Sequence, residues 1–464
     1  MLSKYGLIIM SSNSKSMEVF ETMPVGQAVL KNALPAMAAM LMVLVYNLAD
    51  TFFIGQTGDA LLVAAVSLAT PVFLIFTAVG TAFGAGGTSV ISRSLGVGNK
   101  KHASKVCSFC MWGSAFTGIV LAVLLFAFMD PVLSLIGASA DTWDYAGDYL
   151  RIVSIAAPFV LISNCFSNVI RAEGESTRAM MGQLIGNLLN VVLDPLMILT
   201  FGWGIRGAAI ATVIGNTVGA LYYISFFARG KSSLGVSISN FTLKEKVFTG
   251  VMSIGIPSAL GSLLMSVAQI IMNALMAAYG DMAIAGMGVA MKVITITGMV
   301  SMGLGQGVQP LLGYSAGAGN LTRLKACLKF SLVFAFLLGV LMTLLCVVFL
   351  DPIVSAFLTD PEAYTYAVDF SKILLVTGPL FGVFYVLTNA IQAMGSATAA
   401  LIVNLSRQGF VYIPALYLLD ALVGVTGLAW AQPLADVISV LFGLALYLWS
   451  YKKLRQSLLP KEDI

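Results

Sequence analysis

Long stretches without any charged residue constrain the fold of this chain more than any other feature of its sequence. Seven of them lie between residues 59 and 93, 105 and 130, 206 and 229, 246 and 281, 292 and 323, 329 and 351, and 372 and 407. Each supplies the roughly 20 residues that a helix needs to cross a hydrocarbon layer about 30 Å thick. With 59% hydrophobic and only 10% charged residues, the chain is also unlike a water-soluble globular protein. The sequence therefore predicts an all-α polytopic membrane protein.

Glycines, Asp-Pro pairs and charge clusters divide the chain into twelve predicted transmembrane helices. They are expected at 26–54, 61–92, 106–128, 145–170, 179–201, 207–228, 249–279, 283–314, 326–349, 364–393, 397–418 and 426–450. Most of the 25 Lys and Arg residues lie in the terminal segments or in the loops after helices 2, 4, 6 and 8. The positive-inside rule then places both termini in the cytoplasm. Residues 1–25 contain no extended apolar core, so we expect a cytoplasmic tail rather than a signal peptide.

The same pattern of prolines, glycines and polar residues recurs after about 221 residues. The matching pairs are Pro35 and Pro257, Gly58 and Gly280, Asn99 and Asn320, Asp130 and Asp351, Pro158 and Pro379, Asn168 and Asn389, Gly174 and Gly395, and Gly207 and Gly427. Six helices per copy make both copies point the same way, so a pseudo-two-fold axis is expected along the membrane normal. The predicted domains are an N-lobe at 26–230, a cytoplasmic linker at 231–248, a C-lobe at 249–451 and a tail at 452–464. Duplicated lobes around a cleft are typical of transporters.

Two carboxylates lie inside predicted helices of the N-lobe. Asp50 is eight residues before Gly58, and Asp194 is eight residues before Gly202, so both lie about 12 Å below the outer helix ends. Asn190 shares a helical face with Asp194, and Thr212 lies at a similar depth. Ionisable groups in hydrocarbon are costly, which indicates a function for them.

These four residues suit a shared proton or a hard monovalent cation such as sodium. The alternative is two independent charges that tie helices together. Pro195 cannot donate a backbone hydrogen bond and is expected to let its helix bend. The repeat counterparts of Asp50, Asn190 and Asp194 are Met272, Val411 and Ala415, so the carboxylates occur in one lobe only.

A second group of polar and methionine side chains is a candidate lining for a substrate cavity. Adaptable methionines suit varied amphipathic substrates, but methionine is equally common on lipid-facing surfaces, and paired asparagines also form hydrogen bonds between helices. The candidates are Asn164, Asn168, Met265, Gln269, Met287, Met291 and Lys292. Lys292 either faces the cavity or extends along its stem to the membrane surface. For Arg407, a structural tie is the favoured interpretation.

The sequence resembles the multidrug and toxic compound extrusion (MATE) family over residues 31–453. The stretches that carry the resemblance are LADTFFIG, ISRSLGVGNKKHASK, RAEGESTRA, NVVLDPLMI and GAAIATVIG, in this order. By position, Asp50, Asn190, Asp194 and Thr212 match residues that bind the coupling proton or sodium ion in bacterial members. Members with a second cation site carry a Glu on helix 7 and an Asp on helix 10, and this sequence has neither.

The resemblance implies a secondary antiporter of a bacterial inner membrane that exports amphipathic, cationic drugs or metabolites in exchange for protons or sodium. The alternative is a flippase for lipid-linked precursors, which would need a cavity rich in cations, and only Lys292 and Arg407 are candidates. An enzyme is not expected, because no nucleotide motif, metal set or activated nucleophile is recognisable. The expected partners are a small drug-like molecule and the lipid bilayer, with no nucleic acid, no cofactor and a monomeric state.

Overall fold

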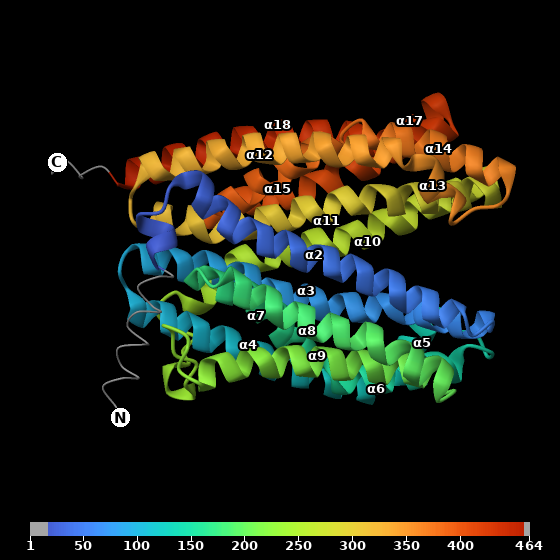
Figure 1. The fold of residues 1–464 in the computed structure, drawn as a ribbon, viewed down its shortest axis with the longest axis horizontal. Helices are drawn as coiled ribbons and strands as arrows, with labels where there is room; N and C mark the ends of the chain where they lie inside the picture. Colours follow the sequence, from blue (N-terminus) through green and yellow to red (C-terminus); the bar gives the residue numbers. More distant parts are fainter. Residues whose placement is uncertain (1–16, 459–464) are drawn as a thin grey trace. The chain divides into compact units, whose positions relative to one another are not determined.

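A computed structural model describes residues 17–458, and the regular structure within this range is entirely helical. The predicted tails lie partly outside the described residues. The helices form two compact units: residues 17–23 and 38–259 make the first, and residues 24–37 and 260–458 make the second. Figure 1 shows the helices of each unit running side by side.

The first unit contains five complete membrane-spanning segments and parts of two others, α2 and α10. Its helices are the second part of α2 (Val25–Gly55), α3 (Ala60–Gly96), α4 (Lys100–Ala127), α5 (Met129–Leu135), α6 (Trp143–Ile155), α7 (Ala157–Val169), η1 (Ile170–Glu173), α8 (Ser176–Asp194), η2 (Pro195–Thr200), α9 (Gly204–Ala228), η3 (Ile238–Asn240) and the first part of α10 (Val247–Met276).

The second unit repeats this order. It contains the first part of α2, the second part of α10, η4 (Ala277–Tyr279), α11 (Asp281–Gly317), α12 (Leu321–Val348), α13 (Leu350–Ser355), α14 (Pro361–Leu375), α15 (Gly378–Ala393), α16 (Ala397–Leu405), η5 (Ser406–Val411), α17 (Tyr412–Val423) and α18 (Val425–Ser457). The duplicated pattern of the sequence therefore corresponds to a duplicated helical fold.

Two of the predicted helices are bent in the structure. The α6–α7 pair bends by 57° and the α14–α15 pair by 48°, whereas the sequence predicts one helix in each place. Pro158 and Pro379 lie in the first turn of α7 and α15, where a proline disfavours helical geometry in the residue before it. Nine further described helices are long and apolar enough to span a membrane, and the α16–η5–α17 run completes twelve segments.

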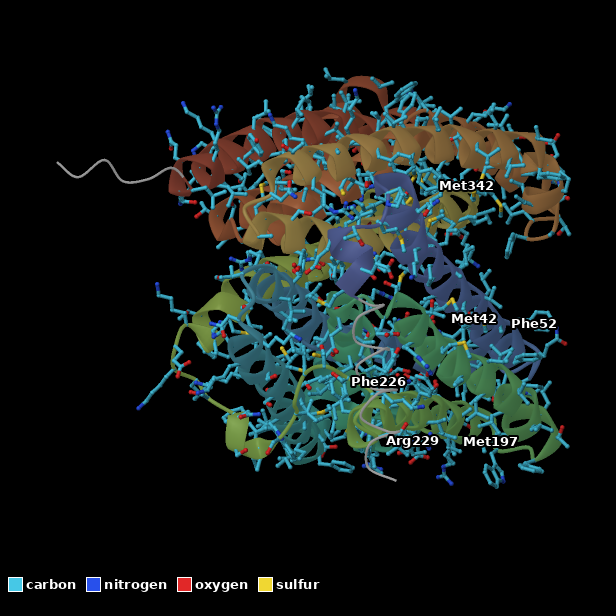
Figure 2. The ribbon with its side chains drawn as sticks, turned by 60° about the vertical axis from the view of Figure 1, so that its left-hand side comes forward. Met42, Phe52, Met197, Phe226, Arg229 and Met342 are labelled. Carbon is cyan, nitrogen blue, oxygen red and sulfur yellow. The ribbon has the colours of Figure 1, made fainter. Side chains whose placement is uncertain are left out.

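One face of α12 exposes only apolar side chains. Leu337, Leu341, Leu344 and Val348 recur every three to four residues, and each is more than half exposed. Figure 2 shows that exposed carbon-rich side chains also cover other helices, with Phe52 projecting from α2. Such a surface is stable against lipid rather than water, which agrees with the membrane prediction.

The repeat is also visible in local hydrogen bonding. Asn99 and Asn320 cap α4 and α12 in the same way, because each side chain accepts a hydrogen bond from the backbone N–H three residues later, at 3.0 and 2.9 Å. Each asparagine follows a glycine with positive φ, 81° at Gly98 and 68° at Gly319. The two loops therefore form the same turn and start equivalent helices.

The predicted linker is fastened to the first unit through the buried carboxylate of Glu173. Ser232 donates its hydroxyl to Oε1 at 2.7 Å, and Ser233 donates its backbone N–H and its hydroxyl to Oε2 at 2.9 and 3.0 Å. Lys105 of α4 also forms an ion pair with Glu245, but Glu245 is more than half exposed. The buried contacts at Glu173 are therefore the stronger attachment.

Glu173→Ala is expected to destabilise the first unit by about 1–3 kcal/mol, because it leaves partly buried donors of the linker without their buried acceptor. Thermal unfolding of the purified protein in detergent measures this as a lower melting temperature. Glu245→Gln, on the same linker but in an exposed ion pair, is the matched control and should change the melting temperature little. Equal effects of the two substitutions would contradict the role assigned to Glu173.

Candidate functional site

The four residues predicted to bind an ion come together in the first unit. Asp50 lies near the end of α2, Asn190 and Asp194 lie in the last two turns of α8, and Thr212 lies in α9. Asn190, Asp194 and Thr212 are buried, and Asp50 is partly buried. The charges of Asp50 and Asp194 are close enough to interact. Three helices thus bring two carboxylates, an amide and a hydroxyl into one site.

The Asn190 amide joins Asp194 to Thr212. Its orientation follows from its neighbours: Nδ2 donates to Oδ2 of Asp194 at 2.9 Å, and Oδ1 accepts from the backbone N–H of Thr212 at 3.0 Å. The same Oδ1 atom of Asn190 also lies 3.3 Å from the hydroxyl oxygen of Thr212. Asn190 therefore fixes one oxygen of Asp194 and leaves the other available.

Two buried carboxylate oxygens in this site lack a partner. Among the described residues, neither Oδ1 of Asp50 nor Oδ1 of Asp194 accepts a hydrogen bond. A buried acceptor that stays unpaired costs about 1–3 kcal/mol, and more when it is charged. A proton on either carboxylate or a monovalent cation between them would remove this cost. No described cluster of three or more His, Cys, Asp or Glu residues suits a transition metal.

Two tyrosines of the site were not predicted from the sequence. Tyr46 of α2 and Tyr149 of α6 both lie close enough to Asp50, Asp194 and Thr212 to interact with them. Tyr46 lies four residues before Asp50 on the same helical face, and this spacing is a signal that could have identified it. Tyr149 is buried in the apolar core of the unit, and no predicted site residue lies on the same helix to indicate it.

The helix that carries Asp194 changes its geometry directly after this residue. The α-helix ends at Asp194, and Pro195–Thr200 continue as a π-helix. Proline removes one backbone donor, and π-helical turns inside helices occur frequently at functional sites. Pro195 thus places a local irregularity beside the carboxylate, while its predicted role in bending remains a prediction.

The predicted cavity residues have varied surroundings. In the first unit, Asn164 and Asn168 each donate to the backbone carbonyl four residues earlier, at 2.9 and 3.0 Å. Positions Gly80 and Gly84 of α3 pack against these two asparagines. Both asparagines therefore contribute to the packing of α3 on α7.

The other five lie in the second unit. Met265 is exposed, Gln269 donates to Asn273 at 3.0 Å, and Met291 is partly buried. Lys292 is exposed, with its ammonium 4.8 Å from the ring centroid of Phe357. Met287 is almost fully buried in the hydrophobic core of its unit, which leaves little of its side chain to contact a substrate.

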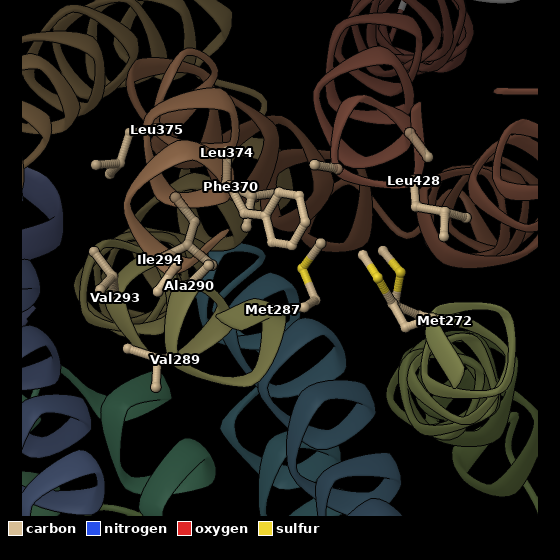
Figure 3. Packing of buried hydrophobic residues seen from close by; sticks show 14 of the residues in the cluster. Met272, Met287, Val289, Ala290, Val293, Ile294, Phe370, Leu374, Leu375 and Leu428 are labelled. Carbon is tan, nitrogen blue, oxygen red and sulfur yellow. The ribbon is translucent and has the colours of Figure 1, made fainter. Parts of the chain in front are cut away.

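The equivalent region of the second unit is apolar. The repeat counterparts of Tyr46, Asp50, Tyr149 and Asp194 are Ala268, Met272, Phe370 and Ala415, and all four belong to one buried hydrophobic cluster. Figure 3 shows Met272, Met287, Phe370 and Leu428 directed toward one another in this cluster. The same scaffold therefore encloses two carboxylates in one unit and hydrocarbon in the other.

Comparison with known proteins agrees with these features. The sequence profile of the MatE family matches residues 35–196 and 257–418, which are the two copies of the repeat. The chain is 32% identical over 420 residues to the multidrug export protein MepA of Staphylococcus haemolyticus, covering 90% of this chain and 92% of the relative. It is 30% identical over 422 residues to MepA of Staphylococcus aureus (strain MSSA476), covering 91% and 93%.

Solved structures share the fold at lower identity. An outward-facing multidrug resistance MATE family transporter of the MOP superfamily has a TM-score of 0.90 at 22% identity, covering 95% of this chain and 99% of the other. A MOP superfamily transporter from Pyrococcus furiosus, described as having a binding pocket of reversed polarity, has a TM-score of 0.87 at 22% identity, with 95% and 98% covered. Together with the family profile and the relatives above, the twelve spans and the duplicated units show that this chain belongs to the MATE family of multidrug efflux transporters.

Proposed function

We propose that this transporter is a secondary antiporter that exports amphipathic, cationic drug-like molecules in exchange for protons or sodium ions. The observation that carries this proposal is the pair of buried, unpartnered carboxylate oxygens on Asp50 and Asp194. The relatives named as multidrug export proteins support drug-like substrates. The proposed orientation has both termini in the cytoplasm, and the proposed state is a monomer.

The coupling follows from the electrostatics of the site. Two carboxylates close together in a poorly hydrated site are unstable while both are charged, so the empty site favours a conformation that separates or hydrates them. A proton or sodium ion that enters from outside removes this repulsion and favours the other conformation. Tyr46, Tyr149 and Thr212 supply hydroxyl groups that can relay a proton or coordinate a cation.

Antiport requires the ion and the drug to favour different conformations. The π-helical turn at Pro195 offers one place where occupancy of Asp194 can change the shape of the unit. The ion then lowers the affinity for the drug on the outside, and release of the ion to the cytoplasm restores it. By the same linkage, bound drug lowers the affinity for the ion by the same factor.

A lipid-precursor flippase is less well supported. Recognition of a pyrophosphate would need several available cations, but Arg407 forms an ion pair with Asp436 at 2.8 Å. Of the two basic candidates, Lys292 alone is exposed. The charges of the second unit therefore give no evident site for a pyrophosphate.

Sealed proteoliposomes that contain the purified transporter test the proposal. We expect a fluorescent amphipathic cation to move against its gradient when an opposing proton or sodium gradient is imposed, and to stop when an ionophore dissipates that gradient. A neutral analogue of similar size and hydrophobicity is the matched substrate control and should be transported more slowly. Transport that continues at the same rate without any ion gradient would refute antiport.

A further inference from the structure

The second unit buries an arginine and an aspartate that the proposed coupling site does not use. Arg407 in the π-helix η5 donates Nε to Oδ1 of Asp436 in α18 at 2.8 Å. Both side chains are almost completely buried. Gln432 donates to the same oxygen at 2.8 Å, and Thr377 donates its hydroxyl to Oδ2 at 2.9 Å. Asp436 thus has partners for both of its oxygens, in contrast to Asp50 and Asp194.

The positive charge of Arg407 also faces aromatic rings. Its guanidinium carbon lies 4.7 Å from the ring centroid of Phe381, 5.1 Å from that of Phe384 and 5.7 Å from that of Tyr385. Aromatic faces stabilise cations, and guanidinium remains charged at any physiological pH. A carboxylate oxygen and ring faces both stabilise a cation, and here the cation is a side chain of the protein itself.

The repeat places this pair near the position that corresponds to the proposed coupling site of the first unit. The offset that relates Gly207 to Gly427 also relates Thr212 of the proposed coupling site to Gln432. Gln432 is a direct partner of Asp436, which lies one turn further along α18. The second unit therefore places a permanently neutralised carboxylate close to the region where the first unit has an unneutralised one.

We infer that Arg407 is a built-in cation that neutralises Asp436, so that the second unit takes up no ion and transport is coupled through the first unit alone. The inference extends the proposed function, because it assumes that ions act at Asp50 and Asp194. Without the guanidinium, Asp436 would be a buried charge with two neutral partners. It would then need a proton or a sodium ion, and the second unit would become sensitive to ions.

The test uses the full-length transporter with the first site removed by Asp50→Asn and Asp194→Asn. In this background, Arg407→Met should make the melting temperature depend on ions, with an increase of about 2 °C or more when the pH falls or when sodium chloride replaces choline chloride. Arg407→Lys keeps the charge and should show no such dependence. The other titratable groups that face the pair are the phenols of Tyr385 and Tyr412, and both are present in every variant compared.

Arg407→Met combined with Asp436→Asn removes both charges and should abolish the new dependence. An Arg407→Met protein whose melting temperature ignores both protons and sodium would overturn the inference. So would a failure of both Arg407→Met and the charge-free double variant to fold, because neutralisation of Asp436 would then not explain the pair. These melting temperatures are measured without transport. The inference about Arg407 can therefore be wrong while the proposed antiport is right, and the proposed antiport can be wrong while the inference about Arg407 is right.

Discussion

Replacing either Asp50 or Asp194 with asparagine is expected to reduce gradient-driven efflux to the level of protein-free liposomes. Asparagine keeps the size of the side chain but can neither bind a proton in this pH range nor carry a charge for sodium. The carboxylate that remains no longer faces a second like charge, so occupancy by the ion would no longer relieve a repulsion or favour one conformation over the other. Both variants should still fold and insert, because each substitution removes an uncompensated buried charge.

The double variant tests whether the two carboxylates act as one site. Groups that act as a unit are not additive, so Asp50→Asn with Asp194→Asn should be no worse than either single variant. Drug binding, measured by fluorescence polarisation in detergent, should persist in all three proteins. Loss of binding together with efflux would indicate a substrate site rather than a coupling site.

The second unit provides matched controls. Met272 and Ala415 are the repeat counterparts of Asp50 and Asp194, and both lie in an apolar core. Met272→Leu and Ala415→Gly should leave efflux within about twofold of the wild-type rate, because volume-conserving or small changes in a core usually cost little. Normal pumping by both asparagine variants would mean that the ion acts elsewhere.

The sequence was sufficient to predict those features that depend on one helix at a time. Counting residues from the outer glycines placed Asp50 and Asp194 at one depth, and helical periodicity placed Asn190 beside Asp194. In the structure, the Asn190 amide joins Asp194 to Thr212. Polar residues inside uncharged runs are rare, so they stand out without any knowledge of the packing.

Features that depend on contacts between helices were harder to predict from the sequence. Tyr149 belongs to the site only because α6 packs against α9, and a tyrosine in an amphipathic helix is unremarkable in a sequence. Met287 illustrates the opposite case, because the property that suits methionine to a drug-binding surface also suits it to the core in which it is buried. Arg407 and Asp436 are 29 residues apart in sequence, and only the fold identifies them as partners.

Alanine at Gly215 is expected to lower both the stability and the coupled efflux rate. Gly186 of α8 and Gly215 of α9 face each other where the two helices cross. A Cβ atom on Gly215 would lie 2.7 Å from the backbone oxygen of Gly186 and 3.1 Å from Cβ of Asn190. Backbone oxygen cannot rotate away as a side chain can, so α9 must move away from α8.

This displacement acts directly on the proposed ion site, because Asn190 on α8 and the backbone N–H of Thr212 on α9 form a hydrogen bond across the same crossing. Overpacking of this kind costs about 1–3 kcal/mol, and valine should cost more than alanine. Gly55, near the end of α2 in the same unit, gives the matched control, because a Cβ atom added there would meet no described atom within 4 Å. Gly55→Ala should be neutral or slightly stabilising, since alanine is the better helix former by about 1 kcal/mol. Melting temperatures and efflux rates of the two alanine variants, measured side by side, decide the matter: if Gly215→Ala behaves like Gly55→Ala, the close crossing of α8 and α9 does not hold the ion site in place.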